Sequence, residues 1–485
     1  MTPATAATTC VPLSDSRANV RTSGPTSGPG FAVTSPRRCS DLSSTTTRVA
    51  GQGEGHVWSV AQHLEDILAT VRPLEPIELQ LLDAQGCVLV DDVTVPVSLP
   101  PFDNSSMDGY AVRAADVAEA SATYPAALEV VGDVAAGAGE PPTVGPGRAA
   151  RIMTGAPLPP GADAVVPVEW TDGGLGEGPV ESMTAHSLAP GGAGGEVRVF
   201  KPAAEGAHVR RAGSDVRAGE RALRAGAVLG APQLALLAAI GTPAVRVRPR
   251  PRVVVLSTGS ELRPPGTELG PGEIYDSNSF ALTAAAREAG ALAFRVGAVA
   301  DDAETLRATI EDQLIRADLL VTSGGVSVGA YDVVKEALAH TTDAEEDGSG
   351  VEFRRLAMQP GKPQGFGSIG PDHTPLFALP GNPVSSYVSF ELFVRPAIRT
   401  LMGVEDIHRP SARAVLRTKK PLGSPEGKRQ FLRGRYDAAR GEVTPVGGAG
   451  SHLVAALAKA DALIVVPEST TELRPGAEVE VLLLG

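Results

Sequence analysis

Residues 318–332 read DLLVTSGGVSVGAYD, and this stretch carries the pattern that decides the fold. Asp318–Val321 is a short apolar run, a glycine-rich turn follows it, and a helical pattern then covers Val333–His340. A short apolar run without polar alternation is typical of a strand that is buried on both faces. The stretch therefore predicts one strand–turn–helix unit of a parallel α/β sheet.

The same unit recurs on both sides of this stretch, between residues 251 and 402. Strands are expected at Arg252–Leu256, Ala293–Val299, Asp318–Val321 and Leu376–Leu379. Helices are expected at Ser279–Ala289, from Asp302 onwards, at Val333–His340 and at Pro383–Leu401, the last with Asn382 as its N-cap. Strands that alternate with helices indicate a doubly wound parallel α/β sheet.

The flanking segments have a different composition. Residues 1–55 are rich in Ser and Thr and lack apolar periodicity, so we expect a disordered tail. A first helix is expected to begin at Ser59, which forms a capping-box pair with Gln62. Short β-type runs between Gly- and Pro-rich turns predict two β-rich domains, at 97–205 and 403–485.

Charge and cysteine usage exclude several classes of protein. The 485 residues carry a net charge of −13, which argues against a general nucleic-acid binder. The three cysteines form no C-x-x-C pair, which argues against a zinc ribbon and favours a reducing compartment, the cytoplasm. No apolar run approaches the roughly 20 residues that span a membrane, so no membrane association is expected.

Three predicted strands end in polar, glycine-rich turns: Ser257–Glu261, Thr322–Gly329 and Leu379–Ser386. Ligands of open α/β sheets bind at the carboxyl ends of the strands. Glycine lets the backbone approach a ligand closely, and N–H groups at turns and helix N-termini bind anions. Together the turns predict a site for a phosphate or another oxyanion.

Acidic side chains lie near these turns, at Glu261, Asp301, Asp302 and Asp332. Carboxylates beside an anionic substrate indicate a bridging divalent cation, commonly Mg²⁺. Asp302 is expected to cap a helix, whereas Asp332 follows a glycine-rich turn directly. Lys362, in a further turn at Met358–Gly365, is a candidate point charge for an oxyanion.

A serine hydrolase is the competing interpretation of residues 325–329, because GVSVG matches the nucleophile elbow G-x-S-x-G. Asp372 with His373, His408 or His452 would complete the chain order of a triad. However, several residues separate Ser327 from the predicted strand, and an elbow places its serine at the strand end. The sequence therefore favours an anion-binding turn.

Six motifs follow one another over residues 56–485. They are PPFDNSSMDGYAV (100–112), RIMTGAPLPPGADAVVPVE (151–169), VVLSTGSEL (254–262), DLLVTSGGVSVGAYD (318–332), MQPGKP (358–363) and LPGNPVSS (379–386). In this combination the chain resembles the molybdopterin molybdenumtransferases, which include bacterial MoeA and the E domain of gephyrin.

The resemblance implies a four-domain subunit that works as a homodimer. Domain I would be discontinuous, at 56–96 and 206–250, and the β-rich domain II would be inserted at 97–205. Domain III, at 251–402, would be the α/β molybdopterin-binding domain, and domain IV, at 403–485, a β-barrel.

The resemblance also implies a transferase reaction. Molybdate is inserted into adenylylated molybdopterin with Mg²⁺-dependent release of AMP, which gives molybdenum cofactor. A molybdopterin adenylyltransferase would be the upstream partner.

Site residues follow from the resemblance by position. The implied catalytic residues are Asp108, Thr154, Glu261, Asp301 and Asp332, of which Asp301 and Asp332 would hold the metal. The implied cofactor-binding residues are Ser323, Gly324, Gly325 and Ser327 around the terminal phosphate, and Lys362, Pro380, Asn382, Pro383 and Ser385 in the cofactor and molybdate pocket. Asp108 and Thr154 would act on the partner subunit's site.

One position departs from the family pattern. Many relatives have KPGKP where this chain has Gln359 before Pro-Gly-Lys-Pro, which removes a positive charge beside the molybdate pocket. Two alternatives stay open on the same fold: a scaffold or receptor-binding protein, and an enzyme that inserts tungstate. The acids at 108, 261, 301 and 332 favour a catalyst over a scaffold.

Overall fold

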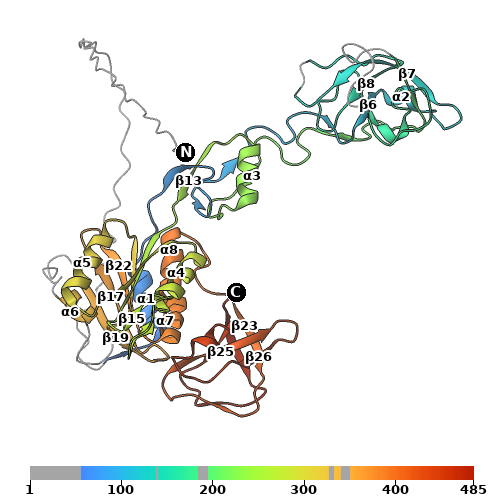
Figure 1. Cartoon of the computed structure of the whole chain (residues 1–485). Helices are drawn as coiled ribbons and strands as arrows, with labels where there is room; N and C mark the ends of the chain where they lie inside the picture. The colour runs from blue at the N-terminus through green and yellow to red at the C-terminus, as the bar shows by residue number, and fades with distance from the viewer. Residues whose placement is uncertain (1–55, 138–139, 184–194, 327–332, 340–349) are drawn as a thin grey trace, which may run out of the picture. The chain divides into compact units, whose positions relative to one another are not determined.

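A computed structural model describes residues 56–137, 140–183, 195–326, 333–339 and 350–485 (Figure 1). The expected tail at 1–55 lies outside the described residues, as do the side chains of Ser327 and Asp332. Residues 56–485 form one compact unit.

The α/β region is built on a seven-stranded sheet with the order β1-β19-β21-β22-β18-β14-β17. The strands are β1 (Val57–Trp58), β19 (Gly350–Leu356), β21 (Pro363–Ile369), β22 (Thr374–Leu379), β18 (Leu319–Ser323), β14 (Arg252–Thr258) and β17 (Leu292–Val299). The four neighbours β22, β18, β14 and β17 run parallel, which confirms the expected α/β core.

The sequence did not indicate β19 and β21, which extend the sheet in antiparallel pairings. The segment Met358–Gly365, expected to be one turn, instead divides between two sheets. Its first two residues form β20 (Met358–Gln359) beside the C-terminal sheet, and Pro363 begins β21. Glycines at 365 and 367 interrupt the apolar pattern of β21, so its strand signal is weak.

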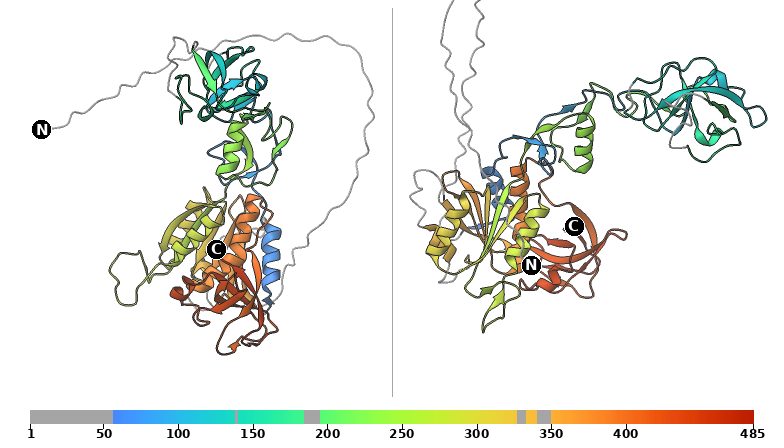
Figure 2. Two further views of the ribbon diagram at one scale, coloured as in Figure 1. Left: turned by 90° about the vertical axis from the view of Figure 1, so that its right-hand side faces the viewer. Right: turned by 45° about the horizontal axis from the view of Figure 1, so that its top comes forward.

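Helices cover both faces of the sheet (Figure 2). They are α4 (Asn278–Glu288), α5 (Ala303–Leu314), α6 (Val333–Ala339), α7 (Pro383–Ser389), the π-helical segment η4 (Phe390–Val394) and α8 (Arg395–Met402). Val253 and Val255 belong to one core with α4, α7 and α8, while Val254 and Leu256 belong to a second core with α5 and α6. Alternate residues of β14 are thus buried on opposite faces, which is why its sequence is a continuous apolar run.

The first helix, α1 (Val60–Thr70), begins as expected. The Ser59 hydroxyl accepts from the Gln62 N–H (3.1 Å), and the Gln62 side chain accepts from the Ser59 N–H (2.9 Å). Val60 and Ile67 join the core that contains α4 and α8, and β1 pairs with β19. The residues of β1 and α1, which the family resemblance assigns to domain I, therefore pack on the α/β layer.

A buried histidine of α1 sits in this core. His63 is 1% exposed, and its ring packs edge-on against Phe393, with the centroids 4.8 Å apart. Nη1 of Arg354 lies 3.3 Å from His63 Nδ1. Burial, and to a smaller extent the Arg354 charge, lower the pKa of His63 from 6.5 to about 3.

We expect His63 to destabilise the fold in acid. The unfolded chain protonates this residue below pH 6.5 and the folded chain only near pH 3. The free energy of unfolding therefore falls as the pH drops through this window, by about 2 kcal/mol at pH 5. Urea titrations at pH 7 and pH 5 should show this loss in the wild type and not in His63→Gln.

His373→Asn, at an exposed histidine, is the control that keeps the wild-type pH dependence. Equal losses in His63→Gln and wild type would contradict the prediction.

A small layer combines segments far apart in the sequence. Its three-stranded sheet has the order β2-β13-β3, from β2 (Ile77–Gln80), β13 (Ala244–Arg248) and β3 (Val88–Leu89). β4 (Val93–Thr94) pairs with β12 (Arg221–Leu223), and α3 (Ala231–Ala239) packs on the layer. These strands come from both sides of the residues 97–205 that are expected to form an insertion.

The insertion and the C-terminal region are both β-rich, as expected. The insertion has a five-stranded sheet of β10 (Glu196–Val199), β7 (Ala126–Val134), β8 (Arg148–Ile152), β6 (Gly109–Val112) and β9 (Ala164–Pro167), in this order, with the short helices α2 (Ala114–Val117) and η1 (Val168–Trp170). In addition, β5 (Asn104–Ser105) pairs with β11 (Val209–Arg210).

The C-terminal sheet runs β25 (Arg429–Asp437), β26 (Glu442–Pro445), β23 (Ser411–Leu416), β29 (Glu478–Leu483) and β27 (Ala462–Val466). It closes into a barrel through the β25–β27 pairing. The short pairs β24 (Leu422–Gly423) with β28 (Glu472–Leu473) and β15 (Leu262–Arg263) with β16 (Ile274–Tyr275), and the helix α9 (Val454–Leu457), complete the described elements. Within the described ranges, every helix is too short or too polar to cross a bilayer.

Candidate functional site

The predicted ligand turns meet at one edge of the α/β sheet. β14 ends at Thr258, β18 at Ser323 and β22 at Leu379, and these strands are parallel neighbours. Their carboxyl ends therefore lie side by side, as the position of a ligand site in this class of sheet requires. Because β18 ends at Ser323, Ser327 does not follow the strand directly, which removes the main support for a nucleophile elbow.

The turn after β18 has room only for glycine. Gly324 and Gly325 have φ angles of +104° and +64°. A Cβ atom on Gly324 would lie 2.5 Å from the Thr258 carbonyl oxygen, and one on Gly325 would lie 2.6 Å from a methyl group of Val334. The backbone is thus pressed against the end of β14. The Gly324 N–H donates to the Leu379 carbonyl at the end of β22 (3.1 Å), and glycine in such a turn lets the backbone approach a ligand closely.

A buried hydroxyl lies beside the same turn. Thr258 is 5% exposed, and its Oγ1 has no hydrogen-bond partner among the described residues. A buried polar group without a partner is costly unless a ligand or water completes it. The position of Thr258 at a strand end beside Gly324 therefore fits an oxyanion ligand.

The turn before α7 shows the expected helix start with one difference. Asn382 stands at the N-cap position with Pro383 next, but its side chain makes no capping hydrogen bond. The Ser451 carbonyl, from the C-terminal barrel region, accepts from the Val384 N–H instead (3.0 Å). Ser385 is buried, and Ser386 Oγ lies 3.3 Å from Ser323 Oγ.

Two predicted acids flank the turn after β14. The Ser260 N–H donates to Asp301 Oδ2, and the Asp301 N–H donates to Ser260 Oγ, both at 3.1 Å. The Glu261 carboxylate folds over Gly259, where a Cβ would lie 2.7 Å from Glu261 Oε2. Both carboxylates are oxygen donors of the type that Mg²⁺ prefers.

Asp302, the neighbour of Asp301, is a helix cap, as expected. Its Oδ2 accepts from the Thr305 N–H (2.8 Å), and these contacts with Thr305 lower the pKa of Asp302. Within the described ranges, no cluster of three or more His, Cys, Asp or Glu side chains is arranged to hold a metal. Asp332, the second predicted metal ligand, lies outside those ranges.

Asp108 and Thr154 meet in the β-rich insertion. Asp108 precedes β6 and Thr154 follows β8, two strands that pair with each other. Asp108 Oδ1 accepts from the Thr154 N–H (2.7 Å) and from the Thr154 hydroxyl (2.9 Å). Both residues are exposed, so the pair presents a carboxylate at the surface of the insertion.

Lys362 is exposed at the start of β21. The turn before it is held against α7, because Gln364 Nε2 donates to the Gly361 carbonyl (2.7 Å) and to Ser389 Oγ (2.5 Å). Gln359, the departure from the family pattern, pairs with Gln430 of β25. The turn thus connects α7 and the barrel.

The sequence-based interpretation missed two residues of this edge, Asp276 and Asn278. Asn278 Nδ2 donates to Ser323 Oγ and to the Gly381 carbonyl, both at 2.7 Å. The available signal was the polar run Asp-Ser-Asn-Ser at 276–279, of which only Ser279 was included in an expected element, the helix at Ser279–Ala289.

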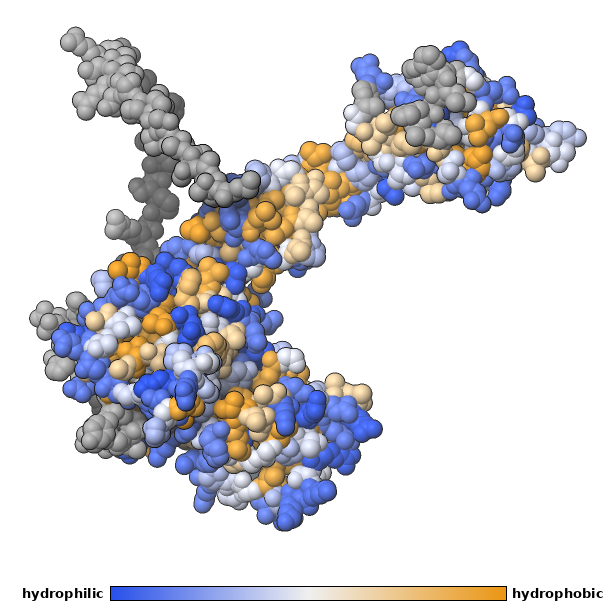
Figure 3. Space-filling view, in the orientation of Figure 1, coloured by the Kyte–Doolittle hydropathy of each residue, from blue (hydrophilic) through white to orange (hydrophobic). Residues whose placement is uncertain are grey.

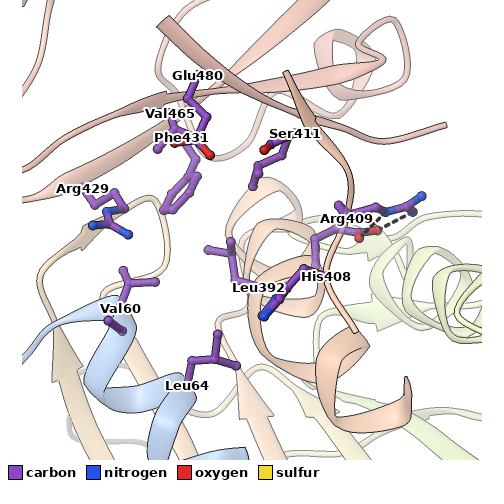
Figure 4. Close-up of a pocket in the computed structure, with 13 residues that line it drawn as sticks. Val60, Leu64, Leu392, His408, Arg409, Ser411, Arg429, Phe431, Val465 and Glu480 are labelled. Carbon is purple, nitrogen blue, oxygen red and sulfur yellow. Dashed lines mark hydrogen bonds and ion pairs between the residues drawn. The ribbon is translucent and has the colours of Figure 1, made fainter. Parts of the chain in front are cut away.

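A separate cavity of about 310 Å³ lies between α1, η4 and the barrel (Figure 4). Val60, Leu64, Leu392 and Phe431 give it an apolar lining. The ion pair of Arg409 with Glu391 (2.7 Å) stands at its edge. None of the site residues implied by the family resemblance lines this cavity, although His408 of the competing triad interpretation does. The predicted chemistry therefore belongs to the sheet edge.

Three family models match the chain in succession. They are the "MoeA N-terminal region (domain I and II)" over residues 58–241, the "Probable molybdopterin binding domain" over 254–400 and the "MoeA C-terminal region (domain IV)" over 415–484.

Similar proteins cover nearly the same span. Molybdopterin molybdenumtransferase 2 of Mycobacterium tuberculosis is 45% identical over 423 residues, which is 87% of this chain and 98% of that protein. Molybdopterin molybdenumtransferase 1 of the same organism is 40% identical, over 88% of this chain and 99% of that protein. A crystal structure of the molybdopterin biosynthesis MoeA protein of Pyrococcus horikoshii superposes with a TM-score of 0.66 at 34% identity, over 89% of this chain and all of that one.

Proposed function

The chain belongs to the molybdopterin molybdenumtransferase (MoeA) family, and we propose that it inserts molybdenum from molybdate into adenylylated molybdopterin and releases AMP. The observation that carries the proposal is that the turns after β14, β18 and β22 lie side by side at one edge of the sheet, which supports an anion-binding site there. The substrate supplies phosphates and molybdate is an oxyanion, so both need N–H and hydroxyl donors.

Different residues would bind the phosphate and the molybdate. The turn at Ser323, Gly324 and Gly325, together with Ser327, would bind the terminal phosphate. The exposed Lys362 would attract molybdate as a point charge, in a pocket with Pro380, Asn382, Pro383 and Ser385. Donors that are already in place stabilise developing negative charge without reorganisation, which favours cleavage of the phosphoanhydride bond.

Mg²⁺ fits the donor set beside this edge. Asp301 and Glu261 flank one turn and offer carboxylate oxygens, the hard ligands that this cation takes. We infer that Asp301 and Asp332 would hold it. When bound, it would neutralise negative charge on the phosphates that are being separated.

A homodimer with a shared site would complete the chemistry. Asp108 and Thr154 form their pair on the insertion, and we infer that this pair serves the sheet edge of the partner subunit. An apolar surface on the α3 layer supports a second copy, since α3 exposes four alanines and Leu82 is 82% exposed (Figure 3). Burial of such a surface against its own copy is the usual basis of a twofold dimer.

The chemistry of the substrate indicates which enzyme acts before this one. Adenylylated molybdopterin is the product of an adenylyltransferase, so we infer that a molybdopterin adenylyltransferase acts upstream, in the cytoplasm. A scaffold role on the same fold would not require the Asp301 and Glu261 carboxylates to flank a phosphate turn.

The test is AMP release by the purified protein. With adenylylated molybdopterin, Mg²⁺ and molybdate, we expect AMP to appear together with active molybdenum cofactor. Parallel reactions with tungstate separate the two oxyanions, and reactions with EDTA test the cation. Bound substrate without AMP release would refute the proposal and favour the scaffold.

A further inference from the structure

One short segment crosses the carboxyl ends of three neighbouring parallel strands, β14, β18 and β22. Asp276 and Ser277 lie between β16 and α4, and Asn278 is the first residue of α4. The segment contacts the end of β14, the end of β18, the turn after β22 and the side chain of Arg295 in the middle of β17. These four strands are successive neighbours in the sheet. The segment therefore links the carboxyl ends of β14 and β18 to the turn after β22.

Asp276 anchors the segment. Its side chain is 2% exposed, and Oδ1 accepts from Ser257 Oγ at the end of β14 (3.0 Å) and from the Ser279 N–H (3.1 Å). The Ser279 hydroxyl donates to Oδ2, and Arg295 of β17 lies 4.0 Å from the same oxygen. A buried carboxylate with this many donors holds the backbone at 276–278 in one place.

Asn278 then joins two ligand turns. Its Nδ2 has two N–H groups, and they point to the two acceptors already described, the Ser323 hydroxyl oxygen and the Gly381 carbonyl. The Ser323 hydroxyl also lies 3.4 Å from the Pro380 carbonyl and 3.3 Å from Ser386 Oγ. Asn278 thus bridges the Ser323 hydroxyl and the turn at 380–382, and it adds to the bond from the Gly324 N–H to the Leu379 carbonyl (3.1 Å) that already joins the two strand ends.

We propose that Asn278 is a positioning residue that holds the two phosphate-binding turns at a fixed separation, an inference that rests on the proposed function. Both of its N–H groups are engaged within the protein, so it acts through Ser323 and Gly381. Without it, the turns lose the side-chain bridge between Ser323 and Gly381, and the ligand has to restrict their remaining freedom at the moment of binding, which weakens binding. The loss falls on substrate affinity more than on turnover.

The test compares Asn278→Ala and Asn278→Ser with Ser277→Ala. Ser277 is the adjacent N-cap residue, and its side chain makes no capping hydrogen bond, so it is a matched control. We expect both Asn278 variants to raise KM for adenylylated molybdopterin about tenfold, with kcat changed less than about threefold. Ser277→Ala should match the wild type in both constants, and all three variants should melt within about 2 °C of it.

A double-mutant cycle identifies the route of the effect. If Asn278 acts partly through the Ser323 hydroxyl, Asn278→Ala should weaken binding less in a Ser323→Ala background than in the wild type. Unchanged KM in both Asn278 variants, or a fully additive cycle, would overturn the proposal.

Calorimetry with inorganic pyrophosphate tests the inference separately from the reaction. We expect Asn278→Ala to bind pyrophosphate about tenfold more weakly than the wild type and Ser277→Ala equally well. If the wild type binds pyrophosphate but releases no AMP, the proposed reaction fails while the role of Asn278 is still measured. Equal pyrophosphate affinities, or no binding by the wild type, would overturn the role of Asn278.

Discussion

Asp301→Asn is expected to lower kcat for AMP release by about 100-fold or more. The substitution keeps an oxygen that accepts from the Ser260 N–H, so the turn after β14 keeps its shape. What it removes is the negative charge of a predicted Mg²⁺ ligand. The half-saturating Mg²⁺ concentration should rise as kcat falls, and a titration of AMP release against Mg²⁺ measures both.

Asp302→Asn is the matched control for this prediction. Asp302 is the next residue, and its carboxylate caps α5 at Thr305. Asparagine is an equally good N-cap, so we expect kcat within about twofold of the wild type. If Asp301→Asn also stays within about threefold, Asp301 does not hold the cation.

The second large effect concerns the shared site. We expect purified heterodimers of one Asp108→Ala subunit and one Asp301→Asn subunit to have about half of the wild-type activity, although each homodimer is nearly inactive. Asp108 lies on the insertion and Asp301 beyond β17. If a site takes one residue from each subunit, such a heterodimer has one intact site and one site with both defects.

The reciprocal heterodimer excludes the other arrangement. When a wild-type subunit is paired with one that carries both substitutions, a shared site leaves one defect in each site, so activity should be nearly lost. A site within one subunit would instead leave about half of the activity. Co-expression with two affinity tags gives both heterodimers, and AMP release distinguishes the arrangements. Activity in the reciprocal heterodimer alone would contradict the proposal.

Local patterns predicted most of the elements. The run Val253–Leu256 is apolar at every position because each face of β14 meets its own layer of helices. Ser59 with Gln62, and Asp302 with Thr305, are short-range contacts within one helical turn. The sequence failed at β19 and β21, because a strand of mixed composition is stabilised by its neighbours in the sheet more than by its own residues.

The candidate site likewise contains residues that the sequence predicts and residues that only the structure identifies. Glycines at 324 and 325 and the acids at 261 and 301 are visible in the sequence, because a tight turn and a charged group are properties of the residues themselves. Asn278 was missed because its two acceptors lie 45 and 103 positions away along the chain. The residues next to Asn278 in the sequence do not indicate contacts with residues so far along the chain.

The sequence by itself therefore determined the alternation of strands and helices, the glycine-rich turns and the residue types of the site, since each depends on a few adjacent residues. Only the tertiary structure decided which turns meet. It placed Asp276 and Asn278 across three strand ends, brought the acids of two turns together through Ser260, and put the Asp108–Thr154 pair on a separate sheet. The physical reason is that these contacts depend on the order and direction of the strands in the sheet. Packing of the whole chain determines that order and direction.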